Sequence, residues 1–200
     1  SQLVIRGSGP DQNLIIMDNI EIFNPYRLYG VFSMFNPETL EDINLITGGF
    51  PSKYGDRLSA VLDVSNREGS KTRYITGQTN INIANANLVF SGKLPFKNIP
   101  GSWIVSTRRS YYDLILAPFA KNAGLIDESA SFPSFQDVQG KLTFGPFNDH
   151  KFVLNGIFSK DAVDIIPGSS RELEDSVSVR DQSSNDVLGF AWHFAPDKKF

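Results

Sequence analysis

The sequence lacks several features on which common protein chemistries depend. It has no cysteine, which excludes disulfides, thiolate catalysis and metal sites with cysteine ligands. Its two histidines, His150 and His193, lie far apart without helical spacing, so we expect no histidine-based metal site. No hydrophobic run approaches the ~18 residues of a membrane-spanning helix. If the chain crosses a membrane, it must therefore cross as a β-barrel.

A strongly basic character is also missing. The net charge is -3, the sequence pI is about 5.4, and no segment carries a basic block. Nucleic acid is therefore not an expected partner. What the chain has in unusual number is aromatic residues, with 16 Phe, 6 Tyr and 2 Trp, together with 16 Gly. This composition favours β-structure with tight turns.

Residues 1–70 have the pattern of a compact mixed α/β unit. Asn36-Pro37-Glu38 predicts a short helix, with Asn36 as its cap and Pro37 at the first helical position. Short apolar runs predict strands at Leu3–Ile5, Leu14–Met17, Ile43–Ile46 and Leu58–Val64.

From about residue 71 the pattern changes to extended strands with a period of two. In Val187–Phe194, bulky side chains at Leu188, Phe190, Trp192 and Phe194 alternate with small or polar ones. Similar alternation predicts strands around 75–91, 103–109, 138–144 and 151–159. At roughly 10 residues per membrane crossing, residues 71–200 supply about six or seven strands.

The predicted connections alternate between short and long, as in outer-membrane barrels. The short ones are Pro95–Gly101, Pro146–His150 and Pro196–Lys199, and the long ones are Ser110–Ser134 and Lys160–Ser184. The periodicity alone fits a soluble β-sandwich equally well, and the loop lengths favour the membrane barrel. Aromatics near the predicted strand ends fit interfacial girdles: Trp103, Tyr111, Tyr112, Phe135, Phe152, Phe158 and Phe194.

Several motifs resemble the plug of TonB-dependent receptors, most closely the Bacteroidetes-type group that often carries an N-terminal carboxypeptidase-regulatory-like domain. The most specific run is Gly48-Gly49-Phe50-Pro51-Ser52-Lys53-Tyr54-Gly55-Asp56-Arg57 and its continuation Leu58-Ser59-Ala60-Val61-Leu62-Asp63-Val64. Asn24-Pro25-Tyr26-Arg27-Leu28-Tyr29-Gly30 and Phe35-Asn36-Pro37 add to it. Met17-Asp18-Asn19-Ile20 has Asn19 where that group usually has glycine. Ser106–Leu114 and Phe135–Leu142 resemble its early barrel strands.

The resemblance implies energy-coupled uptake of a scarce ligand across the bacterial outer membrane. It implies a 22-stranded barrel around a plug, with residues 1–70 as the C-terminal part of the plug and 71–200 as the first barrel strands. The expected fold is thus a mixed α/β plug remnant followed by antiparallel strands of a partial transmembrane β-barrel. The implied partners are the inner-membrane TonB complex, outer-membrane lipid and an unknown small ligand. Too few strands are present to close a barrel, so a fragment of a longer protein is expected.

The resemblance also places two sets of site residues. Those expected to contact ligand are Asn24, Tyr26, Arg27, Tyr29, Phe50, Lys53 and Tyr54. Those expected to join plug and barrel are Asp56, Arg57, Arg108 and Arg109. The alternatives are a local salt bridge or simple solvation for Asp56 and Arg57, and solvation in the lumen for Arg108 and Arg109. Because Arg108 and Arg109 are adjacent in a strand, one of the two must point inward.

No catalytic, metal or cofactor site is predicted. Gly7-Ser8-Gly9-Pro10 lacks the third glycine of a dinucleotide fingerprint, and Pro10 disfavours the helix entry. Carboxylates in the second long connection either bind Ca²⁺ or form a solvated acidic loop: Asp161, Asp164, Glu172, Glu174 and Asp175. The alternatives to transport are a soluble β-rich binding or adhesion module and an outer-membrane barrel enzyme. No Ser/His or paired-carboxylate site for such an enzyme is evident.

Overall fold

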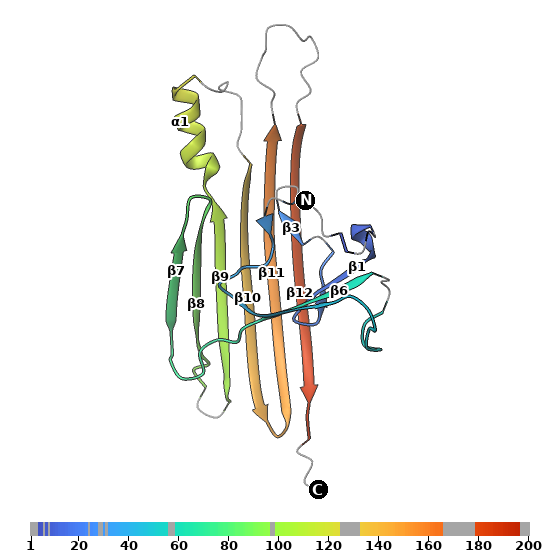
Figure 1. Cartoon of the computed structure of the whole chain (residues 1–200). Helices are drawn as coiled ribbons and strands as arrows, with labels where there is room; N and C mark the ends of the chain where they lie inside the picture. Colours follow the sequence, from blue (N-terminus) through green and yellow to red (C-terminus); the bar gives the residue numbers. More distant parts are fainter. Residues whose placement is uncertain are drawn as a thin grey trace.

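The computed structural model describes residues 4–5, 7, 9–23, 25–27, 30, 32–55, 59–96, 99–124, 133–165 and 179–196. Within these ranges the regular structure is mostly β-strand, in two open sheets and a short two-stranded ribbon. Figure 1 shows one sheet of long strands that run side by side along the molecule, with the N-terminal strands crossing beside them. Among the described residues, no helix is both long and apolar enough to cross a membrane.

The described residues between 9 and 66 form what we call the N-terminal unit. In its four-stranded sheet, in the order β2-β1-β6-β5, β6 pairs in parallel with β1 and antiparallel with β5. Its core contains Ile15, Met17, Ile22, Met34 and Val64, joined by Ile157 from the other sheet. The elements are a 3-10 turn (Pro10–Gln12), β1 (Asn13–Met17), β2 (Ile20–Glu21), β3 (Tyr26–Arg27), β4 (Phe32–Ser33), β5 (Leu40–Ile46) and β6 (Ala60–Asn66).

The hairpin between β1 and β2 turns on two left-handed residues, Asp18 at φ 50° and Asn19 at φ 67°. Asn and Asp tolerate this conformation better than other non-glycine residues, which explains how Asn19 replaces the usual glycine. The turn also aims the Asp18 carboxylate at β6, where it accepts hydrogen bonds from the backbone and the side chain of Asn66 at 3.1 and 3.0 Å.

The helix predicted to start at Asn36-Pro37-Glu38 is absent, and that expectation was wrong. Asn36 does act as a local cap, because its side-chain oxygen accepts a hydrogen bond from the Glu38 amide at 3.1 Å. The Thr39 amide then bonds to the Asn36 carbonyl and closes a turn. From Leu40 the chain enters β5, so pairing with β6 takes the residues that a helix would have needed.

The other sheet, which we call the large sheet, has six antiparallel strands in sequence order. Each strand pairs with the next one along the chain, so the sheet is a simple meander. Its strands are β7 (Thr76–Ile81), β8 (Asn85–Lys93), β9 (Gly101–Ser110), β10 (Ser134–Phe147), β11 (His150–Ile165) and β12 (Val179–Phe194).

The long connections lie at one end of the large sheet and the connections after β8 and β10 at the other (Figure 1). The first long connection includes a π-helical turn (Tyr112–Leu116) and α1 (Ala117–Asn122). The second was predicted too long, because β11 runs on to Ile165 and β12 begins at Val179. The residues of these extensions, 160–165 and 179–184, are mostly polar, so no regular apolar alternation marked them as strand.

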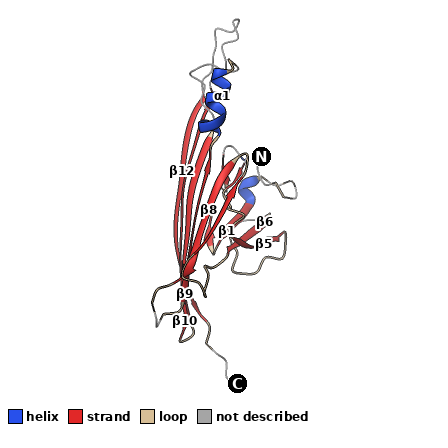
Figure 2. Cartoon of the chain, turned by 90° about the vertical axis from the view of Figure 1, so that its left-hand side faces the viewer, coloured by secondary structure: helices blue, strands red, loops and turns tan. Residues whose placement is uncertain are grey.

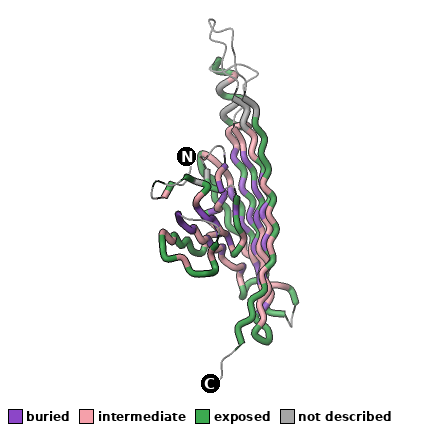
Figure 3. Tube along the Cα trace, turned by 90° about the vertical axis from the view of Figure 1, so that its right-hand side faces the viewer, coloured by how far each residue is buried: buried purple, intermediate pink, exposed green. Residues whose placement is uncertain are grey.

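The two faces of the large sheet have different surroundings. The N-terminal unit lies against one face only, which we call the inner face; the opposite one is the outer face (Figure 2). In Figure 3 the buried segments of the long strands lie beside the N-terminal unit. Along β10 every second residue from Phe135 to Thr143 points inward, and Gln136, Val138 and Leu142 point outward.

Candidate functional site at the interface of the two sheets

The inner face of the large sheet is mainly polar although it is buried. Apolar members such as Val89 and Ile104 are few, and Ile157 is shared with the core of the N-terminal unit. Buried polar groups need partners, and several on this face make hydrogen bonds to the N-terminal unit, whereas the hydroxyls of Ser102, Ser106 and Thr143 have no hydrogen-bond partner among the described residues. The buried polar side chains of the inner face are Asn87, Ser102, Ser106, Arg108, Ser110, Asp137, Gln139, Thr143, Asn155 and Ser159.

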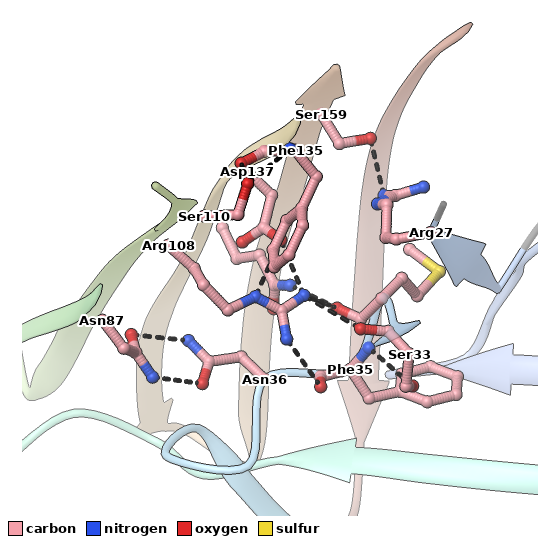
Figure 4. Close-up of polar contacts among 12 residues, drawn as sticks. Arg27, Ser33, Phe35, Asn36, Asn87, Arg108, Ser110, Phe135, Asp137 and Ser159 are labelled. Atoms are coloured by element: carbon pink, nitrogen blue, oxygen red, sulfur yellow. Dashed lines mark hydrogen bonds and ion pairs between the residues drawn. The ribbon is translucent and has the colours of Figure 1, made fainter. Parts of the chain in front are cut away.

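Arg108 is the centre of these contacts (Figure 4). Its Nε and Nη2 donate to one carboxylate oxygen of Asp137, at 3.0 and 2.7 Å. The same guanidinium donates to three consecutive carbonyls of the N-terminal unit, those of Ser33, Met34 and Phe35, at 3.0, 3.2 and 3.4 Å. One side chain of the large sheet thus holds a segment more than 70 residues earlier in the chain.

The strand geometry explains why Arg108 occupies this position. Arg108 and Asp137 are directly opposite each other on β9 and β10, so both side chains leave the sheet on the inner face. The guanidinium also lies over the ring of Phe135, with its Cζ atom 5.1 Å from the centroid. Phe135 is 2% exposed and inward, so its expected place in an outward aromatic girdle was wrong.

Arg109, the adjacent residue, points to the outer face. It pairs with Asp113 at 3.3 Å, and its side chain is 53% exposed. The structure therefore separates the two arginines: Arg108 contacts the N-terminal unit, and Arg109 lies on the opposite face of the sheet. Their proposed roles in transport stay predictions.

Arg27 connects the two units in the opposite direction, from β3 to the large sheet. Its Nη2 donates to the Ser159 hydroxyl at 2.6 Å, and its Nε lies 3.6 Å from the Asp161 carboxylate. Ser159 in turn donates to the backbone carbonyl of Asn185 at 2.9 Å, so the contact extends to β12. Burial lowers the pKa of Arg27, and the carboxylates of Asp161 and Asp137 act in the opposite direction.

Neutral amides add to the same interface. Asn36 and Asn87 exchange two side-chain hydrogen bonds, at 2.7 and 3.1 Å, and both residues are buried (Figure 4). Gln139 donates to the Met34 carbonyl at 2.9 Å, beside the Arg108 contact. These pairs join β8 and β10 to the segment that precedes β5.

A second group of ion pairs lies nearer the short connections. Lys141 contacts the Asp18 carboxylate at 2.7 Å and the Asn66 carbonyl at 2.5 Å. Glu68, just after β6, accepts from Lys151 of β11 and pairs with Lys71 at 2.7 Å. Partial burial raises the pKa of Glu68, but the hydrogen bonds from Lys151 and Lys71 outweigh it and leave the pKa below its ordinary value.

The described residues predicted to contact ligand fall into two places. Tyr26 and Arg27 belong to β3, which Figure 1 shows nearer the long connections than β1 and β6. Phe50, Lys53 and Tyr54 lie in the loop between β5 and β6, where the Tyr54 hydroxyl donates to Asp63 at 2.7 Å. Lys53 is exposed and lies over the Tyr54 ring. Hydrogen bonding to Tyr54 raises the pKa of Lys53. Asn24, Tyr29, Asp56 and Arg57 lie outside the described residues.

Sequence reasoning missed several members of the interface, notably Asp137, Gln139 and Lys141. The sequence does contain a signal for them. They occupy every second position of a strand, and the positions between them include the apolar residues Val138 and Leu142. Asp161, which was expected in an external Ca²⁺-binding or acidic loop, lies within β11 and faces Arg27. The described residues contain no cluster of acidic or histidine side chains able to hold a metal ion. The arrangement provides noncovalent contacts that hold one unit against the other.

Residues 1–61 match the family model of the TonB-dependent Receptor Plug Domain. This match supports a TonB-dependent receptor family and indicates, in general terms, TonB-dependent transport at the outer membrane. That family is one of transporters and not of enzymes. No curated protein and no solved structure matches the chain. The match does not reach the large sheet, so the Bacteroidetes-type subgroup and the division at residue 70 stay predictions.

Proposed function

We propose that this chain acts in energy-coupled uptake of a scarce ligand across the outer membrane, with the N-terminal unit as plug and the large sheet as part of a transmembrane barrel wall. The single observation that carries the proposal is the polarity of the large sheet. Its covered face is polar, and its uncovered face is apolar. A soluble sheet has the reverse arrangement, since it buries its apolar face.

The outer face supports the wall assignment in detail. Along β11 its apolar positions run from Phe152 to Phe158, about 20 Å at the rise of a strand, which approaches the ~25 Å apolar band of outer-membrane barrels. A soluble binding or adhesion module would have to cover this surface, because an apolar patch of this size left in water carries a high risk of aggregation. The exposed apolar side chains of this face are Ile81, Leu88, Phe90, Val105, Val138, Leu154, Phe158, Leu188, Phe190, Trp192 and Phe194.

The polar interface also fits a plug that has to move. Hydrogen bonds such as Asn36–Asn87 and Gln139–Met34 exchange with water at a net cost of roughly 0.5–1.5 kcal/mol each. An apolar interface would instead lose about 25 cal/mol for every Å² that is rewetted. We therefore propose that Arg108 and Arg27 hold the resting plug, and that pulling by the TonB complex exchanges their contacts for water.

For the ligand, we propose contacts from β3 and from the loop between β5 and β6. Tyr26 of β3 is partly buried on the side of the long connections, and Phe50, Lys53 and Tyr54 present aromatic and cationic groups at or near the surface. Arg27 is nearly inaccessible at 2% exposure, so a ligand would reach it only after a rearrangement. These positions favour a ligand with aromatic and anionic groups.

The first test is fractionation of the native protein, with its electrophoretic mobility compared before and after boiling. We expect recovery in the outer membrane and a mobility shift on boiling, because a closed barrel resists detergent until heated. A freely soluble protein without a shift would contradict the wall assignment.

A second test uses the absence of cysteine in this sequence. Single cysteines at Phe190 and at Ala191 are labelled in the native protein with a nitroxide, and quenching by oxygen and by a water-soluble nickel chelate is compared. Phe190 is outward and Ala191 inward on the same strand. We expect the label at 190 to prefer oxygen, as in lipid, and the label at 191 not to. Equal behaviour at both positions would exclude a lipid-facing outer surface.

Transport itself is tested by joining the two units. Cysteines at Asn36 and Asn87 replace a pair whose side chains are in contact, so oxidation should link the N-terminal unit to β8. Uptake of a panel of iron siderophores, cobalamin, oligosaccharides and peptides is then measured in cells with and without the TonB complex. We expect TonB-dependent uptake that stops on oxidation and returns with reductant. Uptake that needs no TonB complex would contradict energy coupling.

A further inference from the structure

We propose that Arg109 and Lys160 form a binding site for the phosphate of an anionic membrane lipid, on the outer face of the large sheet. This inference rests on the proposed function, because it requires the outer face to contact lipid. It concerns a different surface from the interface with the N-terminal unit.

The site is a cavity of about 600 Å³ near the long-connection end of the sheet. Outward positions of β9 to β12 contribute most of its lining: Arg109, Ser134, Gln136, Lys160, Gln182 and Ser184. This lining has two cations and several neutral hydrogen-bonding groups, which is the chemistry that binds a phosphate. Asp161 also borders the cavity but faces inward to Arg27.

Strand register places the two cations beside each other. Arg109 is opposite Gln136, Gln136 is opposite Lys160, and Lys160 is opposite Ser184, so all four belong to one outward row. Two strand spacings separate Arg109 from Lys160, or about 10 Å between their backbones. Both side chains are long enough to reach a phosphate held over Gln136.

The rows next to these cations show why a lipid fits better than a free anion. One step towards the short connections, the outward row contains Leu88, Val138 and Phe158, all exposed. A phosphate held by Arg109 and Lys160 thus lies directly beside apolar side chains that acyl chains would cover. Cations at the edge of a lipid-facing apolar surface are placed at the depth of lipid headgroups.

The neighbouring carboxylates offset the two cations only in part. Asp113 pairs with Arg109 at 3.3 Å, but Arg109 is half exposed, so this pair is weak enough for a phosphate to replace it. Asp186 faces outward one row lower on β12, beside Phe158. Within the described part of the chain, none of the ion pairs includes Lys160.

The test measures lipid retained by the purified native protein in a neutral detergent, by native mass spectrometry. The probes are lipid A monophosphate, phosphatidylcholine and inorganic phosphate. We expect the wild type to retain about one lipid A monophosphate and neither of the others to a similar extent. The double variant R109Q/K160Q should bind lipid A monophosphate at least tenfold more weakly. The exchanged variant R109K/K160R keeps both charges and should bind as the wild type does.

A matched control removes the same charge at the short-connection end of the sheet, with R73Q before β7 and K93Q at the end of β8, and should bind lipid normally. Equal binding by R109Q/K160Q and wild type would overturn the proposal, as would wild-type binding of inorganic phosphate or phosphatidylcholine that matches lipid A monophosphate. Heat-modifiable mobility is recorded for each protein. If the variants keep the shift while lipid binding is unchanged, the lipid site fails and the transport proposal stands. If the wild type shows no shift, the transport proposal fails as well.

Discussion

Neighbouring residues on the same strand of this protein have opposite environments, and the polar residue is the covered one. On β10, Val138 is 45% exposed and lies between Asp137 and Gln139, which are both buried. The N-terminal unit follows the ordinary rule, with Ile15, Met17 and Val64 in its core. The difference teaches that the large sheet is organised around a polar interior and an apolar exterior, as expected for a wall between lumen and lipid.

The largest effect is expected on the inner face, from Arg108. Replacing Arg108 with Met leaves Asp137 buried without its cation and three carbonyls of the N-terminal unit without their donor. Breaking a buried pair in this way typically costs about 3–5 kcal/mol. We expect R108M to lower the temperature of the mobility shift strongly and to release the N-terminal unit to proteolysis.

The outer-face control for this variant is R109M, measured in lipid-free detergent. Arg109 is half exposed and its pair with Asp113 contributes roughly 0–1 kcal/mol. Equal destabilisation by R108M and R109M would remove the distinction between the two faces.

The next effect concerns the outer face alone. Phe190 is outward and 68% exposed, in the middle of the apolar rows of β12. A charge at the bilayer midplane of a barrel costs about 2–4 kcal/mol, falling to about 0–1 near the interfaces. We expect F190R to destabilise the protein in lipid by the larger amount and S184R, on the same face above the apolar rows, by the smaller. Unfolding by urea in vesicles measures both. If S184R destabilised the protein as much as F190R, the placement of Phe190 at the bilayer midplane and of Ser184 near the interface would be wrong.

A smaller effect is expected from the close contact at Gly189. A Cβ at this inward position would lie 1.8 Å from the Cδ1 atom of Ile20, so the side chain of Ile20 must move. Overpacking of this kind costs about 1–3 kcal/mol, and the flexible end of Ile20 puts it near the lower limit. We expect G189A to loosen the N-terminal unit, as seen by faster hydrogen exchange in β2, and I20A to restore it.

Gly156 provides the outward comparison for that variant. Its added Cβ would meet side-chain atoms of Leu188 and Phe158 at 3.3 Å, on the face without the N-terminal unit. G156A should therefore leave hydrogen exchange in β2 unchanged. A change there equal to that of G189A would show that the effect does not come from the contact with Ile20.

The smallest effect is a pH dependence at Glu68, which joins the N-terminal unit to β11. The pKa of Glu68 is lower in the folded protein than in the unfolded chain. Its contribution to stability is therefore fully present above the unfolded pKa, roughly 4.3, and is lost as the pH falls through the folded pKa. Glu68 is partly solvated, so the contribution is below about 1 kcal/mol. The difference in unfolding free energy between wild type and E68Q, measured from pH 7 to pH 3, should shrink in that window. A difference that grows as the pH falls would contradict the assignment.

Strand positions followed largely from the sequence because alternation is a local property. The periodicity of Val187–Phe194 and 151–159 anticipated parts of β12 and β11. The ends of these strands could not be predicted from the sequence. Residues 160–165 and 179–184 are mostly polar, so alternate positions do not differ enough to show a period of two. The prediction of a helix at Asn36 was wrong for a related reason. The chain there leads into β5, and the pairing of β5 with β6 is a long-range contact that the local sequence does not show.

The sequence by itself determined the class of side chain at each alternate position, the lack of cysteine chemistry, and the resemblance in residues 18–64. It also required that one of Arg108 and Arg109 point inward, because neighbours in a strand face opposite sides. Only the tertiary structure decided which one. The N-terminal unit lies against a single face, and its Ser33, Met34 and Phe35 carbonyls meet Arg108 there. That choice depends on segments more than 70 residues apart, and no local pattern carries such information.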